Sequence, residues 1–240
     1  MAVARLYCGA PLATGQAVEL RDEPLHYARN VLRLDTGATL SVFDGLGHEF
    51  SATVVAAGKR SLTLLPGAAL ETPADTGPGI HLGIGLSRGE RMDWVIQKST
   101  ELGVSSITPL LLTRCNARFE EKRAENRLRH WKQVAISACE QCGRARLPLI
   151  EHPATLEHWL AQRPDTAGLV LHTRDSPALA LDTLPTTMRL LSGPEGGLED
   201  AEFARAVDAG LLPWSLGPRV LRTETAPIAA LAILQFLSAR

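Results

Sequence analysis

From Ile80 to the end of the chain, short apolar segments alternate with longer segments of helical periodicity, and this alternation constrains the fold most. The spacing predicts strands at 80–86, 107–112, 147–150, 168–172, 188–191 and 213–216. It predicts helices at 89–102, 119–141, 154–162, 199–209 and 224–238. Because strand and helix follow each other in turn, the pattern predicts an α/β fold built on a mostly parallel sheet.

The first 65 residues follow a different pattern. Short strands are predicted at 38–44, 49–56 and 61–65, with one helix at 25–32. The segment 66–79 is rich in proline, glycine and small residues, a composition typical of a linker. We therefore expect two domains, a small β-barrel over residues 1–72 and an α/β domain over residues 73–240.

Composition narrows the class of protein. No apolar run in the 240 residues approaches the roughly 20 needed to span a bilayer. The first residues lack the long apolar core of a secretory signal. Four cysteines are too few for a disulfide-built fold. A cytoplasmic protein with reduced cysteines and no membrane partner is expected.

The net charge of −1 does not by itself indicate a nucleic-acid-binding protein. Between Arg114 and Arg146, however, the sequence has nine basic and four acidic residues, an excess of five positive charges. An RNA backbone responds to such local potential. The alternative is a solvated helix face with ion pairs between successive turns.

Two glycine-containing loops stand out near the carboxyl end, each between an apolar strand and a helix. The first is Ser192-Gly193-Pro194-Glu195-Gly196-Gly197, and the second contains Gly217-Pro218-Arg219. In open α/β sheets, ligands bind beyond the carboxyl ends of the strands, where such loops lie. Two of them so close in sequence indicate one shared pocket.

Charge indicates what this pocket could bind. Neither GxGxxG nor GxxxxGK[ST] occurs, and Glu195 would repel a pyrophosphate at close range. A carboxylate among glycines better suits ribose hydroxyls, an amino group or a cationic ligand, a description that S-adenosylmethionine fits. Alternatively, Glu195 caps the helix that follows.

GPEGG, followed about two dozen residues later by LGPRVLRTETA, resembles the carboxyl-terminal signature of the ribosomal RNA uridine N3-methyltransferases, the RsmE family of the SPOUT superfamily. Other stretches of the chain are similar to that family as well. They are His26 with VLRLDTG at 31–37, KSTELG at 98–103 and EQCGR at 140–144. Their order along most of the chain makes the resemblance specific.

The resemblance implies a SPOUT-type parallel sheet with a deep carboxyl-terminal trefoil knot, preceded by a PUA-like β-barrel that holds RNA. It implies a homodimer that uses S-adenosylmethionine to methylate N3 of a uridine of 16S rRNA in the small ribosomal subunit. The alanine-rich last helix would suit either the core or a dimer contact.

The resemblance also suggests residue roles. Losing the N3 proton leaves an anion that a cation near O2 or O4 would stabilise, and Arg222 is the first candidate, Arg219 the second. Glu224 would orient an arginine or take the proton; a structural pair or phosphate binding is the alternative. Expected cofactor contacts are His172, Gly193, Pro194, Glu195, Gly196, Gly197, Leu216, Gly217, Leu221, Thr225 and Ala226.

Expected RNA contacts are His26, Arg29, Arg33, Arg114, Arg118 and Arg144. For His26 and Arg33 the alternative is that they cap and flank the helix beside them. His172 could equally bond a backbone group. The motif residues Lys98, Glu101, Glu140 and Gln141 would line the RNA side of the pocket or join two domains or subunits.

Three other interpretations remain open. Cys139 and Cys142 have the CxxC spacing, but without a second such pair we expect no metal and prefer helix packing. A knotted RNA-binding protein without catalysis is the alternative function, although its GPEGG and LRTET stretches are intact. A nucleotide-dependent oxidoreductase or kinase would need one of the phosphate loops that are missing.

Overall fold

The computed structural model describes residues 4–72, 77–116, 124–172 and 184–238. The chain forms two compact units, each with its own core. One comprises Met1–Ala74 with Ile136–Leu147, and the other comprises Asp75–Ala135 with Pro148–Arg240. Helix α3 (Ala124–Cys142) therefore contributes its first turns to the second unit and its last turns to the first. The domain boundary at 72/73 stays a prediction.

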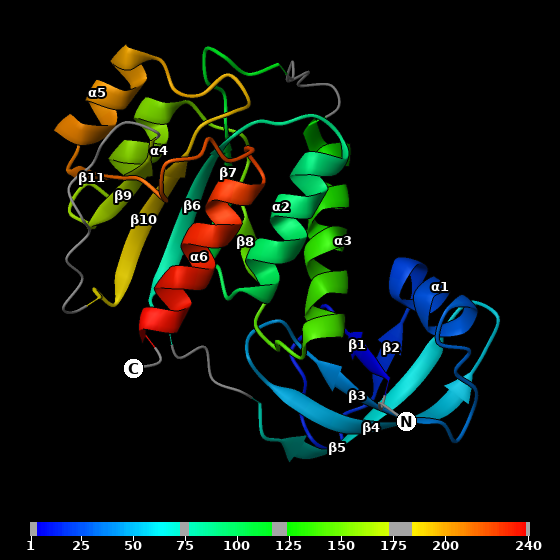
Figure 1. Cartoon of the computed structure of the whole chain (residues 1–240). Coiled ribbons are helices and arrows are strands. Elements are labelled where there is room, and N and C mark those ends of the chain that lie inside the picture. Colours follow the sequence, from blue (N-terminus) through cyan, green and yellow to red (C-terminus); the bar gives the residue numbers. More distant parts are fainter. Residues whose placement is uncertain (1–3, 73–76, 117–123, 173–183, 239–240) are drawn as a thin grey trace. The chain divides into compact units, whose positions relative to one another are not determined.

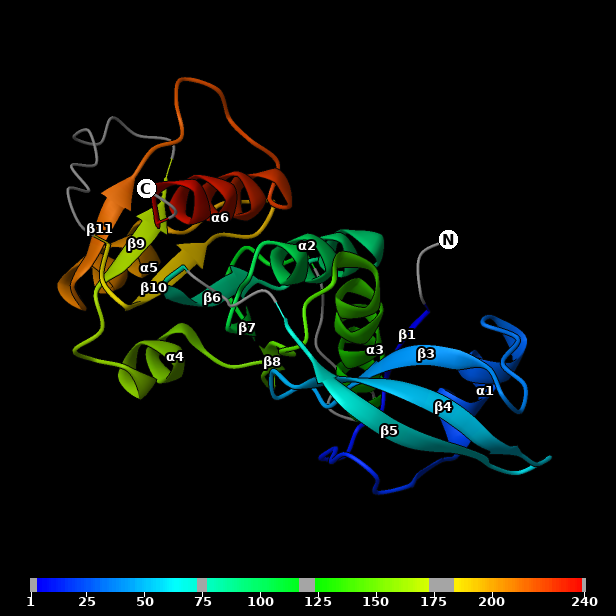
Figure 2. The same ribbon diagram turned by 90° about the horizontal axis from the view of Figure 1, so that it is seen from below.

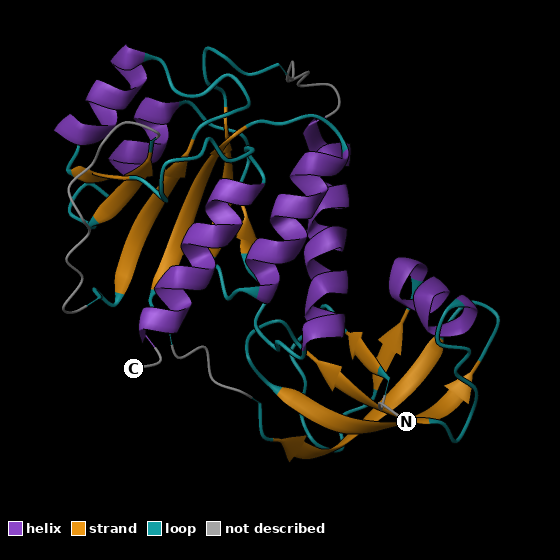
Figure 3. Cartoon of the chain, in the orientation of Figure 1, coloured by secondary structure: helices purple, strands orange, loops and turns teal. Residues whose placement is uncertain are grey.

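The first unit contains a five-stranded sheet and one helix (Figure 3). The strands are β1 (Arg5–Tyr7), β2 (Val18–Leu20), β3 (Thr39–Phe43), β4 (Glu49–Ala57) and β5 (Leu62–Leu70), and the helix is α1 (Asp22–Asn30). The order across the sheet is β1-β3-β4-β5-β2. The small β domain is thus confirmed, whereas the closure of its sheet into a barrel stays a prediction.

The end of the last strand of this unit differs from the expected one. Strand β5 continues through Pro66 and Gly67 to Leu70, where the composition predicted the start of the linker. The partner strand β2 pairs only with residues 62–64, so the segment beyond has β4 as its strand partner, and the carbonyls of Pro66 and Gly67 accept from Gly15 and Thr14 on the other side. Proline and glycine are tolerated there because one side of the strand needs no ladder donor.

The second unit contains a six-stranded parallel sheet in the order β11-β9-β10-β6-β7-β8 (Figures 1 and 2). The strands are β6 (Gly79–Gly85), β7 (Ser106–Leu110), β8 (Leu149–Ile150), β9 (Gly168–Leu171), β10 (Thr187–Ser192) and β11 (Leu211–Trp214). Its other helices are α2 (Glu90–Glu101), α4 (Leu156–Gln162), α5 (Asp200–Asp208) and α6 (Thr225–Ser238). The predicted alternation of strand and helix is confirmed.

Helices cover both faces of this sheet, and each face has its own apolar core. Successive side chains of a strand point to opposite faces, so Leu190 packs against one core and Leu191 against another. The Leu190 core includes buried residues of α2, α3 and α6, and the Leu191 core includes those of α4 and α5. Figure 2 shows α2 and α6 together over one face of the sheet.

Two carboxylates cap the start of α5, which lies where the sequence predicted it. Glu199 is at the N-cap, and its backbone N–H donates to Glu202 Oε2 at 2.9 Å. In this capping box the Glu199 side chain accepts from the backbone N–H of Glu202, as a serine or threonine cap would, and the Glu202 side chain accepts from the backbone of Glu199 in return. For α3, the predicted residues 119–123 lie outside the described residues.

Candidate functional site

A cavity of about 880 Å³ opens in the second unit at the carboxyl ends of β9, β10 and β11. Its size falls within the usual range for a small-molecule site. The strands are parallel, so the loops that follow them meet at one edge of the sheet. The loop 193–198 follows β10, the loop 215–224 follows β11, and both line the cavity.

Close packing against β6 fixes the position of the loop 193–198. A Cβ added to Gly85, the last residue of β6, would lie 2.4 Å from Pro194 N, so only glycine fits there. Gly197 has a φ of +70°, in the left-handed region that favours glycine. Gly197 therefore allows the backbone turn that gives this loop its shape.

The Glu195 carboxylate is largely enclosed and half-satisfied. Its Oε1 accepts a 2.9 Å hydrogen bond from Arg91 Nη1, in the first turn of α2. Its Oε2 is buried and has no hydrogen-bond partner among the described residues. A buried acceptor without a donor is costly, and a ligand that brings an N–H or O–H group would relieve that cost.

The loop 215–224 carries the predicted catalytic residues. Arg219, Arg222 and Glu224 all line the cavity, and Arg222 Nη1 lies 4.0 Å from Glu224 Oε1. The Glu224 side chain is mostly enclosed, whereas that of Arg222 is 80% exposed. An exposed cation beside an enclosed carboxylate can swing toward a bound substrate while the carboxylate limits its range.

A single hydrogen bond joins the two loops directly. The Thr223 hydroxyl donates to the carbonyl of Gly193 at 2.8 Å, and Thr223 is buried. The loops thus meet although they follow different strands.

His172 follows β9 and lines the same cavity. Its backbone N–H donates to the Trp214 carbonyl at 3.1 Å, and its ring lies 4.4 Å from that of Phe203. Of the predicted cofactor contacts, Thr225 begins α6 and is not among the described residues of the cavity wall, while the other ten are.

The predicted RNA contacts fall in different places. Arg114 lines the cavity and donates to the carbonyls of Gly196 and Leu198, so it also secures the loop 193–198. Arg118 lies outside the described residues. The other four belong to the first unit: His26, Arg29, Arg33 and Arg144. His26 and Arg33 are exposed, and Arg33 has a φ of +53°.

Sequence reasoning missed Arg91 and Glu202. No local motif marks Arg91, because its partner Glu195 lies 104 positions away. Glu202 is buried, and its Oε1 accepts from the backbone N–H and the hydroxyl of Thr113 at 2.8 and 3.0 Å. It ties the loop after β7 to the start of α5, near the cavity-lining residues Leu198 and Asp200.

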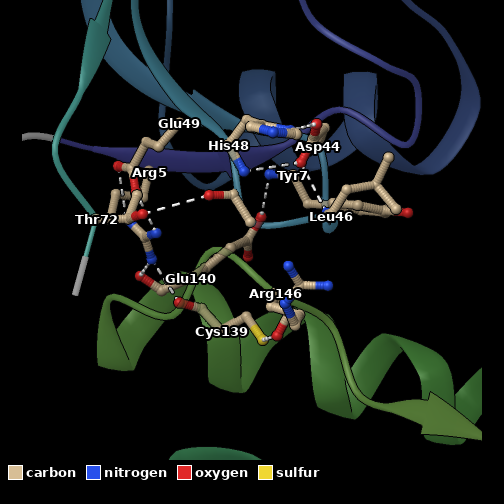
Figure 4. A network of polar contacts seen from close by, with 11 residues as sticks. Arg5, Tyr7, Asp44, Leu46, His48, Glu49, Thr72, Cys139, Glu140 and Arg146 are labelled. Carbon is tan, nitrogen blue, oxygen red and sulfur yellow. Dashed lines mark hydrogen bonds and ion pairs between the residues drawn. The ribbon is translucent and has the colours of Figure 1, made fainter. Parts of the chain in front are cut away.

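A second polar cluster lies in the first unit, around the end of α3 (Figure 4). Arg5 pairs with Glu49 at 2.7 Å and donates to the carbonyls of Cys139 and Glu140. A cation at the carboxyl end of a helix stabilises it through the helix dipole. Glu140 accepts from the Tyr7 backbone, and burial raises the pKa of this carboxyl. Glu140 of the EQCGR stretch thus has a structural role.

Two features of the described part of the chain bear on other functions. Residues 4–72, 77–116, 124–172 and 184–238 contain no group of three or more His, Cys, Asp or Glu side chains placed to hold a metal. Within the same ranges, every helix is too short or too polar to cross a membrane. Cys139 is buried and Cys142 is exposed.

Comparison with known proteins gives consistent matches over nearly the whole chain. The RNA methyltransferase domain family matches residues 75–235, and the RNA methyltransferase PUA domain family matches residues 20–66. The ribosomal RNA small subunit methyltransferase E of Buchnera aphidicola is 33% identical over 97% of this chain and 93% of its own length.

Solved structures show the same similarity. A Legionella pneumophila protein, described as a methyltransferase with bound SAM, is 37% identical with a TM-score of 0.90, covering 99% of this chain and 98% of its own. The Neisseria gonorrhoeae ribosomal RNA small subunit methyltransferase E, bound to S-adenosyl methionine, is 33% identical with a TM-score of 0.90, covering 98% of each chain. The chain therefore belongs to the ribosomal RNA small subunit methyltransferase E family of RNA methyltransferases.

Proposed function

We propose that this protein uses S-adenosylmethionine to methylate N3 of a specific uridine of 16S rRNA in the small ribosomal subunit. The observation that carries the proposal is the meeting of two loops in one cavity, one with the enclosed Glu195 carboxylate and the other with Arg219 and Arg222. Family membership supports the reaction type, and two of its solved relatives were crystallised with this cofactor.

The cavity suits this cofactor in size and chemistry. Its volume of about 880 Å³ accommodates a nucleoside with an amino-acid tail. Glu195 Oε2, which has no partner among the described residues, matches a ligand with hydroxyl or ammonium donors and no phosphate. When bound, S-adenosylmethionine supplies an electrophilic methyl group on a sulfonium. The residues that would hold it are His172, Gly193, Pro194, Glu195, Gly196, Gly197, Leu216, Gly217, Leu221, Thr225 and Ala226.

The chemistry at uridine asks the protein to handle one proton and one developing negative charge. N3 must lose its proton so that its electron pair can form the new bond to the methyl carbon, whose bond to sulfur would break and leave a neutral thioether. The Arg222 guanidinium would lie against O2 or O4 and stabilise the anion, with Arg219 as the second cation. Glu224, 4.0 Å from Arg222, would orient it or accept the proton.

RNA would be bound by both units. In the domain of residues 1–72, His26, Arg29 and Arg33 would contact RNA, joined by Arg144; in the domain of residues 73–240, Arg114 and Arg118 would do so. The exposure of His26 and Arg33 supports this assignment. Arg114 has carbonyl partners in the loop 193–198, so it would contact RNA only with donors that those bonds leave unused.

We further propose a homodimer in the cytoplasm, with the carboxyl-terminal chain threaded as the SPOUT knot. Membership of the family, the resemblance to which implies the knot, supports the threading. The exposed apolar side chains of Ile233 and Phe236 on α6, together with Trp94 on α2, support a dimer face. Sedimentation of the wild type and of the Ile233→Glu variant tests the dimer. We expect the wild type to sediment as a dimer and the variant as a monomer. A wild type that sediments as a monomer would contradict the proposal.

A methyl-transfer assay tests the reaction. Purified protein is incubated with labelled S-adenosylmethionine and small ribosomal subunits that lack the modification. We expect one methyl group per particle, recovered as 3-methyluridine after digestion. Binding of both cofactor and RNA without transfer would favour the non-catalytic alternative, and transfer to another atom would contradict the N3 assignment.

A further inference from the structure

We infer that Arg91 is a positioning residue that acts on the cofactor through Glu195, an inference that rests on the proposed function. Arg91 comes from the first turn of α2, and Glu195 from the loop after β10. Their side chains meet at 2.9 Å. The Arg91 side chain is 50% exposed and that of Glu195 is 18% exposed, so the arginine approaches from the solvent side.

The carboxylate is held at one oxygen. Arg91 donates to Oε1, and among the described residues no hydrogen bond reaches the buried Oε2. Carboxylates with several donors keep their orientation when one donor is removed. Glu195 has no such reserve in the described part of the chain, so the direction of its second oxygen depends on Arg91.

The backbone of the loop is secured separately. Pro194 packs against Gly85, and Arg114 donates to the carbonyls of Gly196 and Leu198. Loss of the Arg91 guanidinium therefore frees the Glu195 side chain and leaves the loop in place. This separation distinguishes a positioning role from a role in folding.

Charge gives a second distinction. Arg91 also offsets the negative charge of Glu195, and without it a cationic ligand would be attracted more strongly. If charge dominated, removing Arg91 would favour S-adenosylmethionine over its neutral demethylated product. If positioning dominates, both ligands weaken equally, because they share the ribose and amino-acid groups. The 2.9 Å hydrogen bond to Oε1, and an Oε2 that nothing in the described part of the chain binds, favour positioning.

The experiment is calorimetric binding of S-adenosylmethionine and of its demethylated product to five proteins: wild type, Arg91→Gln, Arg91→Lys, Glu195→Gln and the double variant Arg91→Gln/Glu195→Gln. Arg129→Gln, at an exposed arginine of α3 that does not line the cavity, is the matched control. We expect Arg91→Gln to raise both Kd values about tenfold, as loss of a charge-assisted hydrogen bond would. Arg91→Lys should restore part of the affinity, and Arg129→Gln should change Kd less than about twofold.

The double variant decides whether Arg91 acts through Glu195. In the Glu195→Gln background, Arg91→Gln should change either Kd less than about twofold, because the group it positions is gone. The same tenfold effect in both backgrounds, an unchanged Kd for Arg91→Gln, or a loss of thermal stability in Arg91→Gln that accounts for the weaker binding would overturn the inference. Failure of the wild type to bind either ligand would overturn the proposed function as well.

Discussion

The two loops of the cavity differ in how the fold supports them. The backbone of the loop 193–198 is held by Arg114 and the close approach of Gly85, and Pro194 and Leu198 are buried. In the loop 215–224, residues 217–220 are all exposed, and the Val220 side chain is 82% exposed. Thr223 is the buried anchor at its end.

This difference corresponds to two tasks. A small ligand is bound with least loss of entropy by a site that is already shaped, which describes the loop 193–198. A large RNA surface brings its own contacts, and the exposed arginines of the loop 215–224 can adjust to it. The comparison therefore predicts that changes in the first loop affect folding and cofactor binding, and changes in the second affect transfer.

Arg222→Ala should show the largest effect. Its side chain is 80% exposed, so the stability and the cofactor Kd should stay near wild type. Loss of a cation at the developing anion should lower the single-turnover rate of methyl transfer roughly 10²–10³-fold. The comparison fails if the cofactor Kd rises in proportion to the loss of rate.

Gly85→Ala should show the next largest effect, on stability. The new Cβ would lie 2.4 Å from Pro194 N, and the displacement should cost about 2–3 kcal/mol. Thermal unfolding should therefore occur roughly 4–12 °C lower. Val220→Ala, in the exposed loop, is the control and should unfold within about 1 °C of wild type. Equal melting temperatures for the two variants would remove the distinction between the loops.

Glu202→Gln tests the support beneath the first loop. Glu202 accepts three hydrogen bonds, from Thr113 and Glu199, and an amide would turn its own N–H group toward a donor. Urea unfolding should show a loss of about 1–2 kcal/mol. Glu157→Gln removes the carboxylate of an exposed pair with Arg205 and should cost less than about 0.5 kcal/mol. A larger cost for Glu157→Gln would contradict this reading.

The pH dependence of stability should show the smallest effect. Burial, with a smaller contribution from the charge of Arg163, lowers the pKa of His81 on β6 to about 4 from its ordinary 6.5. Its neutral form therefore stabilises the sheet fully above pH 6.5, and this contribution is lost as the pH falls toward 4. Because the His81 side chain is partly exposed, its contribution to the unfolding free energy is limited to roughly 1 kcal/mol.

His81→Asn, which can keep a bond to Ser106, should flatten the decline in unfolding free energy between pH 6.5 and 4. His158→Asn, at an exposed position of α4, should leave that decline as it is. Parallel pH curves for wild type and His81→Asn would assign the decline to other groups.

The sequence predicted the second unit better than the first. Long apolar periodicity marks α2 and α6, and buried apolar runs mark β6 and β10, so these elements were found within one or two residues. Strands β1 and β2 have three residues each, too few for a periodic signal, and were missed. Helix α1 begins at Asp22 and not at residue 25, and the apolar pattern did not mark this start because the first turn is polar.

The site was predictable where its residues lie within the motifs. Glu195, Arg219 and Arg222 belong to the two loops, and parallel strands bring such loops to one edge. Arg91 was not predictable from its surroundings, because its partner is distant in sequence. The two hydrogen bonds from Arg114 to backbone carbonyls could not be predicted either, since a basic residue in a basic segment indicates charge and not a specific partner.

The most direct test of the account is nucleoside mass spectrometry of 16S rRNA from cells that lack the gene, complemented with wild type or with Arg222→Ala. The account predicts that one 3-methyluridine disappears on deletion, returns with the wild-type protein and stays absent with Arg222→Ala at equal protein level. An unchanged 3-methyluridine content after deletion, or full restoration by Arg222→Ala, would contradict it.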